Sequence, residues 1–388
     1  MDLPWPDHAA VRAQWPLDPA VTFLNHGSFG ACPSPVLEEQ SRWRALLERQ
    51  PVAFFESALA GHLAHARARV AGFLGAEEDG LVFLPNTTTG VNTVLKGLAL
   101  GPGDEVVFTD HAYPAVDNLI RTLCADTGAD FACVPLPLPL PEPDAIVAAV
   151  MDAVTERTRV VVVDQVTSAT AAILPVERIV RECRSRGVLS LVDAAHAPAM
   201  LPVDLRALDA DFWVGNFHKW LCAPKGAAGL VVRAEHRTRL TPLVTSHAHL
   251  TGFQAPFDWT GTHDPTAILS VPAAIDFLGG LGFERIRAYG HALALAARDG
   301  LAEAFGTEPL VPEPALGMMA SIELPRGLVA TREHAWALHD RVVAETALEL
   351  PFNAWNGRGI VRVSCHAYNH PDEVERLLRD LPAVLARA

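Results

Sequence analysis

Cysteine is scarce in this chain, and its few copies show no pattern. The 388 residues include six cysteines, at positions 32, 124, 133, 183, 222 and 365. Their separations fit neither a disulfide framework nor the short spacings of a zinc site. The pairs His62/His65 and His247/His249 are also without an acid or a cysteine that would complete a metal site. We therefore predict reduced thiols, no metal centre and a cytoplasmic protein.

Positively charged residues are also fewer than negatively charged ones. Lysine and arginine number 31 against 45 aspartates and glutamates, which gives a net charge of −14. An acidic surface offers no counter-charge to a polyanion, so we predict neither nucleic acid nor an anionic membrane as a partner. No apolar run reaches the roughly 18 residues that a membrane span needs. Residues 1–20 carry acids and prolines where a signal peptide would have a basic start and an apolar stretch.

Short apolar runs alternate with amphipathic stretches between residues 60 and 235. The expected strands are 81–84, 105–108, 131–134, 159–163, 189–192, 212–214 and 229–232, and the expected helices are 88–100, 114–126, 143–153 and 175–187. This alternation predicts an α/β fold with a mainly parallel sheet and helices on both faces. In such sheets ligands bind beyond the carboxyl ends of the strands.

The length of the chain favours two domains. Residues 31–265 would form the large domain, which begins with a helix over 35–50. Residues 266–388 would form a connecting helix, broken near 279–282, and a smaller α+β domain with strands at 318–324 and 360–364 and helices at 332–346 and 371–386. Residues 1–30 would complete the small domain and the mouth of the active site.

Lys219 is the candidate for a lysine that binds an aldehyde as an imine. It stands beside His218 and close to Asn216, both able to bind a phosphate, and it precedes Trp220, an apolar neighbour that favours the uncharged amine. Lys225 is the rival, but its proline and glycine neighbours suggest a turn.

An aldehyde cofactor built on a pyridine ring, with a ring hydroxyl and a phosphate, needs further partners. Polar residues that follow other strands can supply them. Asp193 ends a strand and could keep a pyridine nitrogen protonated, with His196 near the ring hydroxyl, although a helix cap is the commoner use of such an aspartate. Thr88 and Thr89 open the helix after 81–84, where free amides bind anions.

Two more residues complete the predicted site. Tyr113 could stack on the cofactor ring, with His111 as the alternative. Arg362, in a predicted strand, could bind a substrate carboxylate with two parallel hydrogen bonds, or could lie on the surface.

Several motifs together carry a family resemblance. They are residues 23–30 (FLNHGSFG), 86–90 (NTTTG), 110–113 (DHAY), 193–196 (DAAH), 218–226 (HKWLCAPKG), 259–265 (WTGTHDP) and 362–369 (RVSCHAYN). With them the chain resembles the class V aminotransferase group of fold-type-I pyridoxal phosphate (PLP) enzymes, over residues 20–385. Within that group it is most similar to the isopenicillin N epimerases.

The resemblance implies a role for each candidate residue. Lys219 would form the Schiff base, Asp193 would contact the ring nitrogen, and His196, with Ser168, would lie near the ring hydroxyl. The implied phosphate ligands are Thr88, Thr89, Asn216 and His218, and Arg362 would bind the substrate carboxylate. The resemblance also implies a homodimer in which Thr262 reaches the cofactor of the neighbouring subunit. Asn25, His26 and Phe29 are expected at the mouth of the site, in contact with the substrate.

The resemblance leaves the reaction open. We expect an amino-acid epimerase or racemase, in which Lys219 removes the α-proton and the ring holds the charge as a quinonoid. Tyr113 is the candidate that donates a proton to the opposite face. A β-eliminating C–S lyase on a cysteine conjugate or sulfoxide is the alternative, and an aminotransferase or a non-catalytic PLP-fold protein is less favoured. Cysteine desulfurases share this fold and carry a nucleophilic cysteine shortly before the strand that holds the arginine. Here residues 350–359 contain no cysteine, and Cys365 follows Arg362 within the strand, so a desulfurase is also less favoured.

Overall fold

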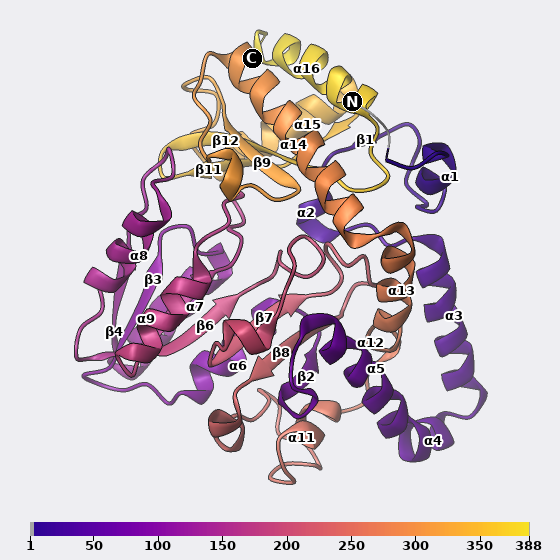
Figure 1. Ribbon diagram of the computed structural model, residues 1–388, viewed down its shortest axis with the longest axis vertical. Helices are drawn as coiled ribbons and strands as arrows, with labels where there is room; N and C mark the ends of the chain where they lie inside the picture. Colours follow the sequence, from indigo (N-terminus) through magenta and orange to yellow (C-terminus); the bar gives the residue numbers. More distant parts are fainter. Residues whose placement is uncertain (1–3, 388) are drawn as a thin grey trace.

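A seven-stranded sheet forms the centre of the larger part of the molecule in this computed structural model, which describes residues 4–387 (Figure 1). Its strands, in chain order, are β2 (Leu81–Leu84), β3 (Glu105–Thr109), β4 (Asp130–Val134), β5 (Thr158–Asp164), β6 (Leu189–Asp193), β7 (Phe212–Asn216) and β8 (Ala228–Val232). They lie in the order β2-β8-β7-β6-β5-β3-β4. Only β8 runs antiparallel to its two neighbours. The prediction of a mainly parallel sheet is therefore confirmed.

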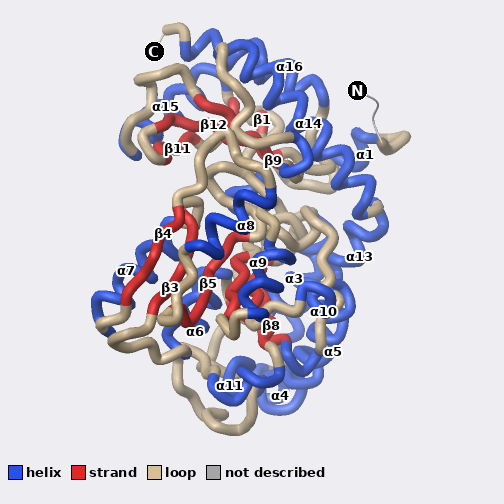
Figure 2. The backbone as a smooth tube through the Cα atoms, turned by 60° about the vertical axis from the view of Figure 1, so that its left-hand side comes forward, coloured by secondary structure: helices blue, strands red, loops and turns tan. Residues whose placement is uncertain are grey.

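Helices cover both faces of this sheet, as Figure 2 shows. The helices that pack around it include α5 (Leu59–Leu74), α6 (Thr87–Gly97), α7 (Pro114–Thr127), α8 (Pro143–Asp152) and α9 (Val176–Ser185). The buried apolar side chains of α6 and α7 form one cluster with one face of the strands, and those of α5, α8 and α9 belong to a second cluster. A strand buried on both faces needs apolar residues at successive positions, which explains the run of four valines in β5.

The smaller domain contains a three-stranded antiparallel sheet in the order β11-β12-β9. Its strands are β9 (Met319–Glu323), β11 (Phe352–Trp355) and β12 (Arg358–Ser364), and its helices are α15 (Arg332–Thr346) and α16 (Pro371–Leu385). The N-terminal segment joins this domain, because β1 (Thr22–Phe23) pairs with β10 (Leu348–Glu349). Figure 1 shows that β1 and the C-terminal helix α16 lie at the same end of the molecule.

The helical connection between the domains is interrupted at more places than predicted. It consists of α12 (Thr266–Leu269), α13 (Val271–Leu281) and α14 (Phe283–Phe305). The main break falls at Gly282, whose φ of 90° lies in a region that glycine tolerates and other residues rarely adopt. Beside this connection runs α3 (Ser34–Arg49), which matches the helix predicted over 35–50.

Among the described residues, no helix by itself has the length and apolar content to cross a bilayer. The segments Thr266–Leu281 and Phe283–Phe305 together have the length and apolar content of a membrane span. The two segments are, however, bent by 75° relative to each other.

Candidate active site

A cavity of about 190 Å³ lies where several strands of the large sheet end. Its walls come from the ends of β5, β6 and β7, the start of α6, and the short helix α2 (His26–Phe29). The residues that line it are Ser28, Phe29, Asn86, Thr87, Thr88, Tyr113, Asp164, Ser168, Asp193, Ala195, His196, Asn216, His218 and Lys219. Nine of them are residues predicted for the site, and the cavity lies beyond the carboxyl ends of the strands, where ligands bind in open α/β sheets.

Lys219 lines this cavity, and its amine is partly uncharged at neutral pH. Its Nζ lies 3.2 Å from Nε2 of His196. Burial, assisted by the positive charge of Arg362, lowers the pKa of Lys219 to about 7, although Asp193 acts in the opposite direction. A substantial fraction of the amine is therefore unprotonated at neutral pH and able to attack an aldehyde.

Lys225 does not line this cavity. Its Nζ donates a hydrogen bond of 2.9 Å to the backbone carbonyl of Gly30. The rival lysine therefore has a structural partner away from the cavity.

Asp193 shares the floor of the cavity with a second carboxylate, Asp164. The two residues are register partners at the ends of the neighbouring strands β5 and β6. Burial raises the pKa of Asp193 to about 6, while the backbone amide of Ala195 donates to its Oδ1 at 3.0 Å. Burial and then the nearby charge of Asp193 raise the pKa of Asp164 well above its usual range. The two carboxylates therefore disfavour being ionised together, and Asp193, with a pKa of about 6, is mostly ionised at neutral pH. Asp164 was not among the predicted site residues, although its position directly after a strand was a signal for it.

The N-terminus of α6 lies at the cavity. Asn86 caps the helix by accepting from the amide of Thr89 at 2.8 Å. The amide of Thr87 donates to Oδ1 of Asn216 at 2.9 Å, and the buried hydroxyl of Thr87 has no hydrogen-bond partner. Thr88 lines the cavity as predicted.

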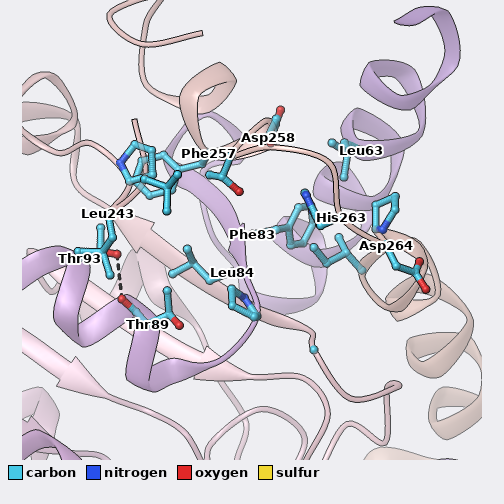
Figure 3. Close-up of a pocket in the computed structure, with 17 residues that line it drawn as sticks. Leu63, Phe83, Leu84, Thr89, Thr93, Leu243, Phe257, Asp258, His263 and Asp264 are labelled. Carbon is cyan, nitrogen blue, oxygen red and sulfur yellow. Dashed lines mark hydrogen bonds between the residues drawn. The ribbon is translucent and has the colours of Figure 1, made fainter. Parts of the chain in front are cut away.

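Thr89 differs from its expected position. Its hydroxyl donates to Asn86 at 3.0 Å, and its side chain lines a neighbouring cavity instead (Figure 3). The reason is helical geometry, because residues one apart on a helix point about 100° away from each other.

His218 lies in the wall near this helix end. Burial lowers the pKa of His218 to about 4, and its Nδ1 lies 3.0 Å from the carbonyl oxygen of Ala227. Its neutral ring donates through Nδ1, which leaves Nε2 as an acceptor. A hydrogen bond from Nε2 to a phosphate therefore requires the ring to take up a proton.

Arg362 reaches the edge of the cavity from β12 in the small domain. Its guanidinium donates to the carbonyl oxygen of Ser168 at 2.5 Å and to the hydroxyl of Ser28 at 3.0 Å, and both serines line the cavity. The Nε atom is buried without a partner. Burial lowers the pKa of Arg362 to about 10, so the group keeps its positive charge at neutral pH. The prediction left open a surface position, but this arginine is only 4% exposed.

Tyr113 and Phe29 form the open part of the wall, with 43% and 74% of their surfaces exposed. His111, the alternative to Tyr113, is buried and does not line the cavity. Its ring nitrogens lie 2.7 Å from the hydroxyl of Thr170 and 2.9 Å from the carbonyl oxygen of Leu136. Of the two candidates, Tyr113 is therefore the one that lines the cavity.

The structure does not place Asn25 and His26 at the mouth. Asn25 donates to Glu349 at 2.9 Å, and its Oδ1 accepts from Ser28. His26 is completely buried, with its nitrogens 2.9 Å from the hydroxyl of Tyr368 and 3.1 Å from the carbonyl of Lys219. Both expectations are corrected because the first turn of α2 directs these side chains into the protein, toward the small domain and the backbone of Lys219. Only Ser28 and Phe29 of this segment line the cavity.

Thr262 is exposed and lies outside this cavity. It belongs to a loop whose neighbours Thr260 and His263 line a second, mostly apolar cavity of about 410 Å³. Figure 3 shows Leu63, Phe83 and Phe257 among the residues around this cavity.

The groups in the first cavity fit PLP. A lysine amine can hold the aldehyde, the Asp193 carboxylate can contact the ring nitrogen, and the start of α6 can hold the phosphate. The unsatisfied hydroxyl of Thr87 is a donor that such a phosphate would use.

Comparison with known proteins shows the family of this chain. The family model for aminotransferase class V matches residues 36–377. Isopenicillin N epimerase from Amycolatopsis lactamdurans is 35% identical over 96% of this chain and 97% of its own length. Putative L-cysteine desulfhydrase 1 from Oryza sativa is 34% identical over 95% and 84% of the two chains. Cysteine desulfurase from Thermococcus onnurineus has the same fold, with a TM-score of 0.83 at 21% identity, covering 100% and 99%. The chain thus belongs to the aminotransferase class V family of pyridoxal-phosphate-dependent enzymes.

Proposed function

We propose that this enzyme removes the α-proton of an amino acid and returns a proton to the opposite face, which makes it an epimerase or racemase. The observation that carries this proposal is the partly unprotonated Lys219 amine, held in one cavity with the ionised Asp193. When bound, PLP supplies an aldehyde that condenses with amines and a ring that withdraws electrons from the α-carbon.

Three residues of the chain would carry out different parts of this reaction. Arg362 binds the substrate carboxylate and fixes the orientation of the α-carbon. Lys219, with a pKa of about 7, accepts the α-proton on its Nζ. Asp193 keeps its negative charge near the ring nitrogen, which favours the protonated form of that nitrogen.

Inversion requires a second proton donor on the face away from Lys219. Tyr113 lines the cavity and has a hydroxyl group, so we assign it this role. The Tyr113→Phe variant should therefore exchange the α-proton on one face without inverting the substrate.

A β-eliminating C–S lyase is the second candidate. It is favoured by the relative from Oryza sativa, which is described as a putative L-cysteine desulfhydrase. In this reaction Tyr113 would protonate the leaving group. The cavity-lining residues include no cysteine, so no nucleophile for a desulfurase reaction stands among them.

Incubation in heavy water separates the two reactions. The purified enzyme, loaded with PLP, would be given L-cysteine, isopenicillin N and a panel of D- and L-amino acids. Incorporation of α-deuterium with loss of optical activity supports epimerisation, whereas release of pyruvate with sulfide supports elimination. Absence of both, from an enzyme that binds PLP, contradicts the proposal.

We also propose that the enzyme is a homodimer in which Thr262 reaches the cofactor of the other subunit. The exposure of Thr262 supports this, as does the apolar cavity beside its loop (Figure 3), because a second copy would bury that apolar surface.

A further inference from the structure

Trp220 connects the lysine loop to His196 through its indole nitrogen. The indole is completely buried, and its Nε1 lies 3.1 Å from Nδ1 of His196. The other nitrogen of His196, Nε2, lies 3.2 Å from Nζ of Lys219. His196 therefore stands between a tryptophan that can only donate and the lysine that holds the cofactor.

The protonation of His196 follows from these two contacts. Burial, together with the nearby positive charge of Lys219, lowers the pKa of His196 well below its usual value, so the ring is neutral at neutral pH. A neutral imidazole carries one N–H and one lone pair. Since Nδ1 must supply the lone pair that accepts from Trp220, the hydrogen resides on Nε2. Nε2 is then the donor, and the unprotonated form of the Lys219 amine supplies the accepting lone pair.

Two stacked histidines hold the backbone on which Trp220 sits. Nε2 of His26 lies 3.1 Å from the carbonyl oxygen of Lys219, and Nε2 of His366 lies 3.2 Å from that of Trp220. Both rings are completely buried, and their centres are 4.4 Å apart. The side chain of Cys222 lies close to both Nε2 atoms. A metal site is not needed to explain this group, because the two nitrogens already have carbonyl partners. The consequence is that the indole of Trp220 has little freedom to move away from His196.

We propose that Trp220 is a positioning residue that fixes His196 in the tautomer with its hydrogen on Nε2, so that His196 presents a hydrogen-bond donor to the cofactor cavity. Without the indole N–H, the ring could place its hydrogen on Nδ1 and turn a lone pair toward Lys219. A donor at this place stabilises negative charge on a cofactor oxygen, whereas a lone pair repels it. The inference rests on the proposed function only for its effect on the cofactor; the tautomer itself can be tested without it.

The tautomer can be measured by NMR of the ring nitrogens in protein labelled with ¹⁵N-histidine, with and without PLP. The signals of His196 are identified by their loss in His196→Gln. In the wild type we expect an unprotonated Nδ1 and a protonated Nε2, and in Trp220→Phe a population with the hydrogen on Nδ1. Trp213→Phe is the matched control, since Trp213 is equally buried but donates to Gln165 at 3.1 Å; it should leave the His196 signals unchanged.

The loaded enzyme provides a second measurement, the pH midpoint of its visible colour change. Loss of the donor should raise this midpoint by about one pH unit in Trp220→Phe and leave it unchanged in Trp213→Phe. If Trp220→Phe does not fold, benzothienylalanine at position 220 replaces the indole N–H by sulfur in the same shape.

Two results would overturn the inference. One is a wild-type His196 with its hydrogen on Nδ1, which needs no variant to observe. The other is a folded Trp220 variant whose His196 signals match those of the wild type. A failure of the proposed function would look different, because the tautomer would be as expected while the amino-acid substrates remained unchanged.

Discussion

Two lysines close together in the sequence have different surroundings in the fold, and this difference can be tested residue by residue. Lys219 lines the cavity, whereas Lys225 binds the carbonyl of Gly30. Lys219→Ala should lose covalent attachment of PLP and at least about a thousandfold in turnover. Borohydride trapping followed by peptide mapping measures the attachment.

Lys225→Met is the control for that experiment. It should keep the label on Lys219 and cost only about 1 kcal/mol of stability, the typical loss for one hydrogen bond. A label on Lys225 in the wild type would contradict the assignment of the site.

The pKa of Lys219 also predicts how cofactor binding depends on pH. Only the unprotonated amine attacks an aldehyde, and the pKa of Lys219 in the cofactor-free protein is about 7. The rate of PLP uptake by cofactor-free protein should therefore rise with pH and reach half its maximum near pH 7, several units below the value for an exposed lysine. Stopped-flow absorbance provides the measurement, and a midpoint near pH 10 would contradict a desolvated amine.

The lowered pKa of Lys219 also makes the stability of the cofactor-free protein depend on pH. The pKa of Lys219 is lower in the folded state than in the unfolded state, so the unfolded chain binds more protons between about pH 7 and pH 10.5. This residue therefore makes the cofactor-free protein more stable as the pH rises through that window. Lys219→Met should remove this contribution, and denaturant unfolding at several pH values would detect its loss.

At the scale of elements, the start of α6 has a structural role and a proposed role in binding the phosphate. Asn86 accepts from the amide of Thr89, which stabilises the helix end that faces the cavity. Asn86→Ala should cost about 1 kcal/mol of stability and also weaken PLP binding, because the helix end that would hold the phosphate becomes less ordered.

A second capped helix provides a control that separates the loss of stability from the loss of PLP binding. Thr331 caps α15 by accepting from the amide of His334 at 3.3 Å, and it does not line the cavity. Thr331→Ala should lower the stability by a similar amount and leave the PLP affinity unchanged. Equal losses of PLP affinity in both variants would mean that the end of α6 has no special role in binding.

At the scale of the whole molecule, the proposed dimer predicts recovery of activity when two inactive variants are mixed. Lys219→Ala lacks the amine, and Thr262→Glu would place a negative charge near the phosphate of the partner's cofactor. In a mixed dimer, one of the two sites keeps both wild-type residues. An equal mixture should therefore regain roughly a quarter of the wild-type activity after subunit exchange. A mixture of Lys219→Ala with Lys219→Met should stay inactive, and no recovery in the first mixture despite demonstrated exchange would exclude a shared site.

The amino-acid sequence by itself determined the alternation of strands and helices, the mainly parallel sheet and the position of the cavity. Local patterns suffice for these, because apolar runs mark buried strands and the carboxyl ends of parallel strands meet at one edge. Lys219, Asp193 and Thr88 were recognisable for that reason, since each stands close behind a strand.

Only the tertiary structure decided which way individual side chains point and what they contact. Asp164 becomes the neighbour of Asp193 through strand register, and Thr89 turns into a different cavity from Thr88. His26 lies against the backbone of Lys219, 193 positions away. Such contacts depend on packing between segments that are distant in the chain, and no local periodicity records them. The tautomer proposed for His196 is of this kind, because it depends on an indole 24 positions further along.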